Sequence, residues 1–325
     1  MNADELLACP CCRHFPLLSD GDGYACEPCG AAFPSRDGVQ VFLRPGAEIA
    51  SNDAARAEFW DAGWEMRNSR LLALERDGIL KERQAYLDYV LKERYPSAVD
   101  IGPNVVAGKT FLNIGCGGGF EGLLFAGYGT RYIGVDFSHN AVRFTRDLVR
   151  KAGFGGDTFQ AEAEALPFRD GSIDYVYSSG VLHHTPNTED ALNEVYRVVK
   201  PGGTAMIALY ATNSLMFLWY RLHAVLRGNL SRKAIDDWMN ANTEGEWQTG
   251  ERQNKWTKTY TKPQFLTLMT TAGFSDIRIE QSHLQIKTMP IVGKIVGALL
   301  PEIAGDMRVG RFGSMLIATC SKPSQ

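Results

Sequence analysis

Four cysteines near the N-terminus have the spacing of a metal site. Cys9 and Cys12 form one C-x-x-C pair, Cys26 and Cys29 form a second, and thirteen residues separate the pairs. A tight turn within each pair can aim both sulfurs at one point, and four thiolates satisfy tetrahedral zinc. Because four thiolates leave no coordination position for water or substrate, we predict a structural zinc site rather than a catalytic one.

The cysteine pattern allows interpretations other than a four-thiolate zinc site. The chain has seven cysteines, and five lie within its first 29 residues. One alternative is that the cysteines are reduced and bind no metal. A segment this short, however, buries too little hydrophobic core to be stable without a metal ion or a disulfide. Disulfides are not expected in a reducing cytoplasm. Cys11 is the odd one out, although C-x-C spacing would allow it to replace Cys12 as a ligand.

A glycine-rich turn follows an apolar run in the middle of the chain. Gly115, Gly117 and Gly119 form G-x-G-x-G, with Cys116 inside it. Glycine permits positive φ and a close approach of the backbone to a ligand. Asp136 ends the next predicted strand, seventeen residues after Gly119. A carboxylate there can accept both ribose hydroxyls of an adenosine. Dehydrogenases share these features, so this unit predicts a nucleoside site and leaves the reaction open.

Three later segments indicate which class of reaction the nucleoside site serves. They are AEAEALPF at 161–168, GSIDYVYSSGVLHH at 171–184 and EVYRVVKPGG at 194–203. With the glycine run they resemble class I S-adenosylmethionine-dependent methyltransferases, especially the group that includes ubiquinone and menaquinone biosynthesis enzymes. The resemblance covers about residues 108–210. It implies a Rossmann-like α/β fold with helices on both faces of a seven-stranded sheet, in the order 3-2-1-4-5-7-6 with an antiparallel last strand. S-adenosylmethionine would be the methyl donor and S-adenosylhomocysteine the product.

The same resemblance implies roles for individual residues. The three glycines would wrap the methionine part of the cofactor, and Asp136 would hold the ribose. Other positions would meet the adenine or the sulfonium: Phe137 against the adenine, Glu162 and Ala163 at its edge, and Ser178 and Ser179 near the sulfonium.

Two positions depart from the family pattern. Asn113 replaces the usual aspartate of the first motif, so one carboxylate near the cationic cofactor is missing. Glu162 replaces the usual aspartate at the adenine and reaches one methylene further. We expect cofactor binding to survive both changes, with lower affinity.

The N-terminal segment carries a second resemblance. Residues 5–44 are similar to the small zinc-ribbon family best known as an activator subunit of eukaryotic RNA and protein methyltransferases. The shared residues are Leu7-Ala8-Cys9-Pro10, Cys29-Gly30 and the run from Phe33 to Gly38. This resemblance implies a scaffold or partner role rather than a chemistry.

Two histidines are candidates for the catalytic base. His183 and His184 follow the strand predicted at 173–178, at the cofactor edge of the sheet. A hydroxyl or carbon acceptor needs a base, and either ring could serve. The alternative is that the pair begins a helix and only packs, as is common in the family. Tyr210, at the end of the strand predicted at 204–210, faces the same crevice.

The hydrophobic pattern predicts how the chain is divided. Residues 1–45 form the ribbon, 46–107 a helical connector or lid, and 108–325 the methyltransferase domain, with an insertion at about 211–260. Strands are predicted at 110–114, 131–135, 173–178, 204–210, 275–281 and 312–320, and helices at 52–67, 79–95, 139–152, 188–199 and, behind a capping box at Thr261, up to Ala272.

Aromatic residues outside the motifs bear on the acceptor. Trp60 and Trp64 of the connector are predicted to form a lid on the cofactor or part of the core. The apolar and aromatic residues 214–226 of the insertion would roof the acceptor pocket or pack against the sheet. A roof of this composition would suit a lipophilic or aromatic acceptor.

Composition excludes few partners. Hydrophobic residues make up 45% of the 325 residues, charged residues 22%, and the formal net charge is −3. We expect a cytoplasmic protein without a secretory leader or membrane span, acting on a small molecule, and we leave a homodimer open. An RNA methyltransferase that uses the ribbon to bind nucleic acid is an alternative that the charge disfavours. A cofactor-binding scaffold with weak activity is another, supported by Asn113.

Overall fold

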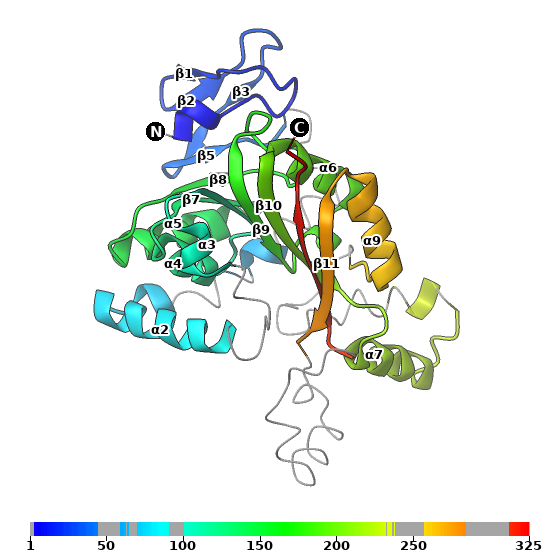
Figure 1. The fold of residues 1–325 in the computed structure, drawn as a ribbon. Coiled ribbons are helices and arrows are strands. Elements are labelled where there is room, and N and C mark those ends of the chain that lie inside the picture. Colours follow the sequence, from blue (N-terminus) through cyan, green and yellow to red (C-terminus); the bar gives the residue numbers. More distant parts are fainter. Residues whose placement is uncertain are drawn as a thin grey trace.

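The computed structural model describes residues 3–44, 59–62, 64, 70–90, 101–231, 233–235, 237, 257–283 and 312–324. A twisted central sheet has helices on both sides, and the N-terminal segment lies at one end of it (Figure 1). The strands are β1 (Leu18–Asp20), β2 (Gly23–Ala25), β3 (Ala32–Phe33), β4 (Ser35–Arg36), β5 (Val39–Val41), β6 (Thr110–Ile114), β7 (Arg131–Asp136), β8 (Asp157–Gln160), β9 (Ile173–Ser179), β10 (Val199–Tyr210), β11 (Ser275–Ser282) and β12 (Met315–Ser321). The helices are η1 (Ala3–Leu6), α2 (Arg76–Tyr89), α3 (Pro103–Val106), α4 (Phe120–Ala126), α5 (His139–Lys151), η4 (Leu182–His184), α6 (Thr188–Val198), α7 (Leu215–Leu226) and α9 (Lys262–Thr271).

The central sheet has nine strands, in the order β11-β12-β10-β9-β6-β7-β8-β5-β4. Counted from β6, seven of them run 3-2-1-4-5-7-6, and the last, β12, is antiparallel to both neighbours. All seven predicted strands are therefore present in the predicted order, and two further strands extend the sheet. The extra strands come from the N-terminal segment, where β5 pairs in parallel with β8. β8 would otherwise be an open edge, and β5 satisfies its exposed backbone groups.

Two apolar layers cover the sheet. On one face, α4 packs Leu124 and Phe125 against Phe111 and Tyr175 of the strands. On the other face, α6 and α9 bury Leu192, Phe265 and their neighbours. Side-chain caps fix where the helices start, as the capping box at Thr261 shows. The Thr261 hydroxyl accepts a hydrogen bond from Gln264 N, and the Gln264 side chain accepts one from Thr261 N. That capping box confirms the prediction from the sequence.

Some element bounds differ from those predicted. α6 ends at Val198, and the Pro201-Gly202-Gly203 run lies inside β10 rather than at the end of the helix. The register between β9 and β10 shifts there, because the glycines allow the strand to bend. Of the predicted connector helices, residues 59–62 and 64 are helical and the second is α2; the rest of residues 52–67 and 79–95 lies largely outside the described residues.

The N-terminal segment shares the core of the rest of the chain. β1, β2 and β3 form a small antiparallel sheet of their own. Leu7 makes a β-bridge with Phe168, and the Phe42 ring lies 5.6 Å from that of Phe159 in β8. The predicted ribbon therefore packs against the large domain as part of one hydrophobic cluster.

Membrane-spanning helices are not found among the residues described. None of the helices there is long and apolar enough to cross a bilayer.

Candidate cofactor and acceptor site

The glycine turn joins β6 to α4 and admits no larger residue. Gly115, Gly117 and Gly119 have φ of 78°, 44° and 74°. A Cβ on Gly115 would lie 2.1 Å from a methyl carbon of Val181, and one on Gly117 would lie 2.6 Å from the indole of Trp64. The turn is thus a backbone cradle of the kind that approaches a ligand closely. Cys116 inside it is buried.

Asp136 connects this turn to the start of α5. Its carboxylate accepts hydrogen bonds from Gly117 N at 3.0 Å and from Ser138 N at 2.9 Å. Burial raises the pKa of Asp136 to about 6, the two backbone donors oppose that rise, and the neighbouring Asp61 adds to it. A half-buried carboxylate held at the ends of two parallel strands has the placement expected of a ribose ligand.

Residues 59–62 and 64 lie across the carboxyl ends of the strands. Asp61 accepts hydrogen bonds from the Ser138 hydroxyl and, at 3.1 Å, from Asn140 N. The Trp64 indole lies on Gly117, and the Trp60 ring lies 5.5 Å from that of His184. This segment therefore covers the turn after β6 and reaches the loops after β7 and β9.

Asn113 makes a contact that the sequence did not predict. Its Nδ2 donates to the Tyr132 hydroxyl at 3.1 Å, and both side chains are buried. Its Oδ1 has no hydrogen-bond partner among the described residues. The amide therefore satisfies a buried phenol of β7.

The other predicted cofactor residues lie along the same edge of the sheet. Glu162 is ion-paired with Arg44, whose Nε lies 2.8 Å from Oε2. Gln160 Nε2 donates to Phe137 O at 2.9 Å and holds the backbone after Asp136. Ala163 is buried, Ser178 is buried with no partner for its hydroxyl among the described residues, and Ser179 ends β9.

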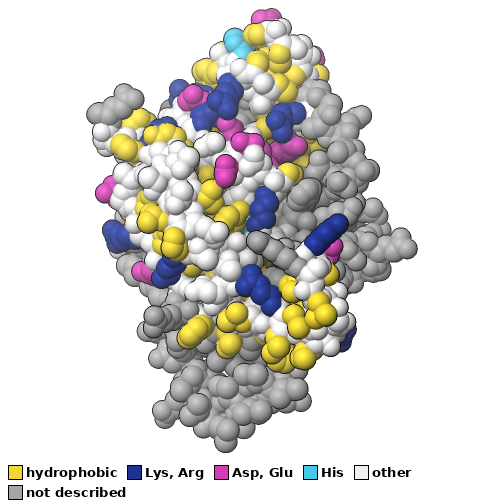
Figure 2. Space-filling view, turned by 90° about the vertical axis from the view of Figure 1, so that its right-hand side faces the viewer, with side chains coloured by type: hydrophobic (Ala, Val, Ile, Leu, Met, Phe, Trp, Pro, Cys, Tyr) yellow, Lys and Arg dark blue, Asp and Glu magenta, His cyan; other side chains and the backbone are white. Residues whose placement is uncertain are grey.

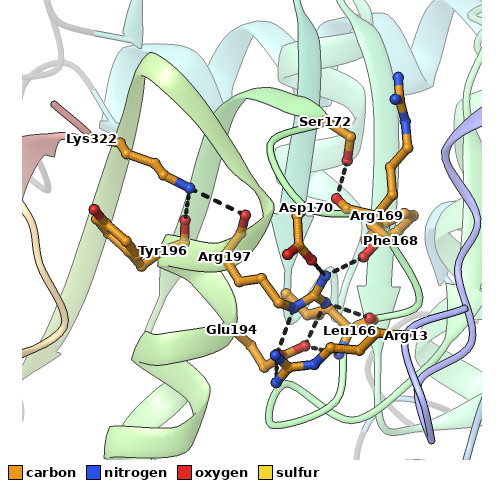
Figure 3. A network of polar contacts seen from close by, with 10 residues as sticks. All are labelled: Arg13, Leu166, Phe168, Arg169, Asp170, Ser172, Glu194, Tyr196, Arg197 and Lys322. Atoms are coloured by element: carbon orange, nitrogen blue, oxygen red, sulfur yellow. Dashed lines mark hydrogen bonds and ion pairs between the residues drawn. The ribbon is translucent and has the colours of Figure 1, made fainter. Parts of the chain in front are cut away.

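An arginine from α6 fixes the loop that carries Glu162 and Ala163 (Figure 3). Arg197 donates to Leu166 O at 3.0 Å and to Phe168 O at 2.6 Å. Glu194 accepts from Arg197 and also from Arg13 of the N-terminal segment, at 3.0 Å. The E-x-x-R part of the 194–203 motif therefore has a structural role.

Histidine and aromatic rings gather where β9 and β10 end. The His183 ring centroid lies 4.0 Å from that of Tyr210 and 4.2 Å from that of His184. Phe217 of α7 lies 5.1 Å from Tyr210 on the other side. His183 is fully buried, and neither ring nitrogen has a partner among the described residues. Burial lowers the pKa of His183 well below its usual value, so the ring is neutral.

The end of the insertion closes over this cluster. Lys258 N donates to His183 O at 3.1 Å, and its ammonium donates to Thr185 O and Pro186 O at 2.9 and 2.7 Å. Tyr260 N donates to Tyr210 O at 2.9 Å. Sequence reasoning missed Lys258 because no motif surrounds it.

The four predicted cysteine ligands come together. Their sulfurs all lie within 4.8 Å of one another, with Cys9–Cys29 at 3.6 Å and Cys12–Cys26 at 3.5 Å. Tetrahedral zinc with Zn–S bonds of ~2.3 Å places sulfurs ~3.8 Å apart, so the group fits that ion. Cys11 is exposed and stands outside the group.

Comparisons with known proteins point to one domain. Residues 112–207, from β6 to β10, match a family described as a methyltransferase domain. The chain is 38% identical over 103 residues to an uncharacterized methyltransferase of Mycobacterium marinum, covering 32% of this chain and 40% of that protein. It is 30% identical over 145 residues to the demethylmenaquinone methyltransferase of Geobacillus kaustophilus, covering 42% of this chain and 62% of that protein. The matches thus span less than two thirds of these relatives.

Similar solved structures include one from a complex between the Haloferax volcanii Trm112 methyltransferase activator and a methyltransferase. Its identity is 17% and its TM-score 0.47, over 75% of this chain and 94% of that chain.

Proposed function

We propose, from the premise that residues 112–207 form a methyltransferase domain, that the chain transfers a methyl group from S-adenosylmethionine to a small-molecule acceptor. The observation that carries this proposal is the hydrogen bond from Gly117 N to the half-buried carboxylate of Asp136. That bond brings the backbone cradle and the ribose ligand together at one edge of the sheet. S-adenosylmethionine supplies a methyl group that its positive sulfur already activates, so the protein must mainly position the acceptor and exclude water.

Each part of the proposed cofactor site has support in the geometry. The cradle at Gly115 and Gly117 would receive the methionine part, and Asp136 the ribose hydroxyls. Glu162, held by Arg44, and buried Ala163 would border the adenine. Trp64, which lies on Gly117, would cover the bound cofactor.

The cluster of rings supports a proposal for the class of acceptor. Trp60 and Tyr210, both half-buried, lie against the buried rings of His184 and Phe217 at the end of β10. Such a lining favours a flat, apolar acceptor. The relative from Geobacillus kaustophilus is a demethylmenaquinone methyltransferase, which agrees with this class. We therefore propose a lipophilic aromatic acceptor of the quinol type.

His183 is the proposed base. The acceptor hydroxyl would lose its proton to a His183 nitrogen, and the nucleophilic atom of the resulting anion would bond to the methyl carbon as the C–S bond breaks and S-adenosylhomocysteine leaves. Where that atom is a ring carbon, its own hydrogen then leaves as a proton and the aromatic ring is restored. A neutral imidazole accepts a proton at its unprotonated nitrogen, and neither His183 nitrogen has a hydrogen-bond partner among the described residues. Burial, which lowers the pKa of His183, opposes the charged ring that would form. The competing interpretation is that His183 only packs against Tyr210.

The zinc site would be structural. We propose that Cys9, Cys12, Cys26 and Cys29 hold one zinc ion, which fills its coordination sphere with thiolates. The ion would hold the N-terminal segment in the shape that delivers β5 to the sheet.

The test uses the purified chain with S-adenosylmethionine and a chemically reduced demethylmenaquinone analogue, and measures S-adenosylhomocysteine release. We expect turnover by the wild type, and a loss of about 10²–10⁴-fold in His183→Phe because a base is removed. His183→Phe should bind S-adenosylmethionine with unchanged affinity in calorimetry. His14→Phe, at an exposed position, is the control.

Three outcomes are informative. Full turnover by His183→Phe would show that the ring only packs. Binding of S-adenosylmethionine without turnover of any quinol would refute the acceptor class. Failure of the wild type to bind S-adenosylmethionine would refute the proposed function as a whole.

A further inference from the structure

Helix α7 is apolar on two opposite faces. Phe217 and Ala224 are buried against the rest of the chain. Leu218, Leu222 and Leu226 are exposed, at 46%, 50% and 72%. With Val225 they follow the i, i+4, i+7, i+8 spacing of one helix face. A helix that is hydrophobic all round is normally buried, so the outward stripe needs an occupant.

The surroundings of this stripe are basic. The sequence has no Asp or Glu between Glu194 and Asp236, and Arg221, Arg227, Arg232 and Lys233 lie in α7 or within a few residues after it. Arg227 and Lys233 are exposed. Seen from the side on which α7 lies, the molecule has hydrophobic side chains gathered low on its face, with Lys and Arg beside them (Figure 2). This basic area is local, because the whole chain has a net charge of −3.

The basic residues around the leucine stripe indicate which partner could cover it. A second copy docked through the same stripe would bring the cations of both copies together, which opposes that contact. An anionic lipid surface offers phosphates to the cations and an acyl boundary to the leucines. Helices with Leu on one side and flanking Arg or Lys lie in that boundary without spanning the bilayer.

We propose that the outward face of α7 docks the protein on an anionic lipid bilayer. α7 begins five residues after β10 ends, and its Phe217 ring lies 5.1 Å from that of Tyr210. Docking would therefore put the lipid surface directly behind the ring cluster at the end of β10. This inference does not depend on methyl transfer, because it rests on the outer face of the helix.

The experiment is sedimentation of the full chain with vesicles of phosphatidylcholine alone, and with phosphatidylcholine and phosphatidylglycerol in equal amounts. Binding should occur to the anionic vesicles and weaken in high salt. The double variant Leu222→Glu, Leu226→Glu should lose it. Leu266→Glu, at an exposed leucine of α9, is the matched control and should keep it.

Two variants that each remove one positive charge test the contribution of the basic residues. Arg227→Gln should weaken binding about fivefold, the effect of one basic residue near an anionic surface, whereas Lys262→Gln on α9 should not. No binding of the wild type to anionic vesicles would overturn the proposal. So would light scattering that shows a dimer lost in the Leu222→Glu, Leu226→Glu variant, because a second copy would then cover the stripe. Circular dichroism confirms that each variant is folded.

Discussion

At the scale of single residues, Asp136 combines two opposed requirements. Backbone donors from Gly117 and Ser138 favour its charge, while burial and Asp61 disfavour it, and the balance leaves its pKa at about 6. Groups perturbed in this way gather at functional sites. Ribose hydroxyls are best accepted by the ionised carboxylate, so the protonation state of one residue should control cofactor affinity.

Lowering the pH should therefore weaken S-adenosylmethionine binding. With a pKa of about 6 for Asp136, the affinity should fall about tenfold between pH 7 and pH 5. Calorimetry at a series of pH values measures the midpoint. Asp61→Asn should move that midpoint to lower pH, because it removes a charge that raises the pKa of Asp136. Asp136→Ala should abolish binding at every pH, and Asp147→Ala, on the exposed side of α5, should not. An affinity that is flat across this range would exclude the ionised carboxylate as the ribose ligand.

The same shift affects folding in the opposite direction. The pKa of Asp136 is raised from 3.8 to about 6, so the folded state holds this proton more tightly than the unfolded state. The contribution of Asp136 to the unfolding free energy of the ligand-free protein therefore declines as pH rises from about 4 to about 6. Above that range the charge costs the folded state roughly 3 kcal/mol. The placement of Asp136 therefore lowers the stability of the ligand-free protein at neutral pH and keeps an ionised carboxylate in the proposed cofactor site.

At the scale of elements, α6 and the loop from β8 to β9 depend on one arginine. The Arg197 side chain is 8% exposed and that of Glu194 is 5% exposed, whereas that of Arg13 is 62% exposed. Removing one partner of a buried pair leaves an uncompensated charge, which costs more than losing an exposed one. Although Arg197 and Arg13 both bind Glu194, they should contribute very differently.

Arg197→Met should lower the unfolding free energy by about 3–5 kcal/mol, because two backbone carbonyls and Glu194 lose their buried donor. Arg13→Ala should lower it by about 1 kcal/mol or less. Urea denaturation of both variants measures the difference. Equal losses would mean that the pair owes its stability to the surface contact with the N-terminal segment.

At the scale of the whole molecule, the N-terminal segment and the large domain share one sheet. β5 pairs with β8, Ala8 N donates to Pro167 O at 3.0 Å, and Arg146 Nη1 donates to Asp37 O at 2.8 Å. The ordering that zinc would impose on the ribbon should therefore be felt in the β8 edge and the loop after it.

Removing zinc with a chelator should lower the melting temperature of the entire chain in a single transition. Structural zinc contributes folding free energy directly, and the shared sheet couples that contribution to the large domain. Differential scanning calorimetry and elemental analysis measure the melting and the metal content. Cys26→Ser should behave like the chelated protein, whereas Cys11→Ser should retain zinc and melt like the wild type. Identical melting with and without metal would refute the zinc site.

Part of this protein can be predicted from its sequence because the signals are local. The spacing of Cys9, Cys12, Cys26 and Cys29 predicts a cluster, which the structure assembles. The glycine run after a strand predicts a turn of positive φ. Thr261 and Gln264 predict a helix start, since both partners of the cap lie within one turn. Neighbours in the chain are constrained to be neighbours in space, so such patterns need no knowledge of the packing.

Only the tertiary structure decided the rest. β5 lies beside β8, Arg44 reaches Glu162, and Trp64 lies on Gly117, although long stretches of chain separate the partners. Lys258, at the end of the insertion, holds the His183 loop. Each contact depends on how the helices pack on the sheet. Neither the periodicity of hydrophobic residues nor the spacing of motifs specifies that packing. The sequence by itself thus determined the cradle, the carboxylate and the four thiols, and packing decided what covers and connects them.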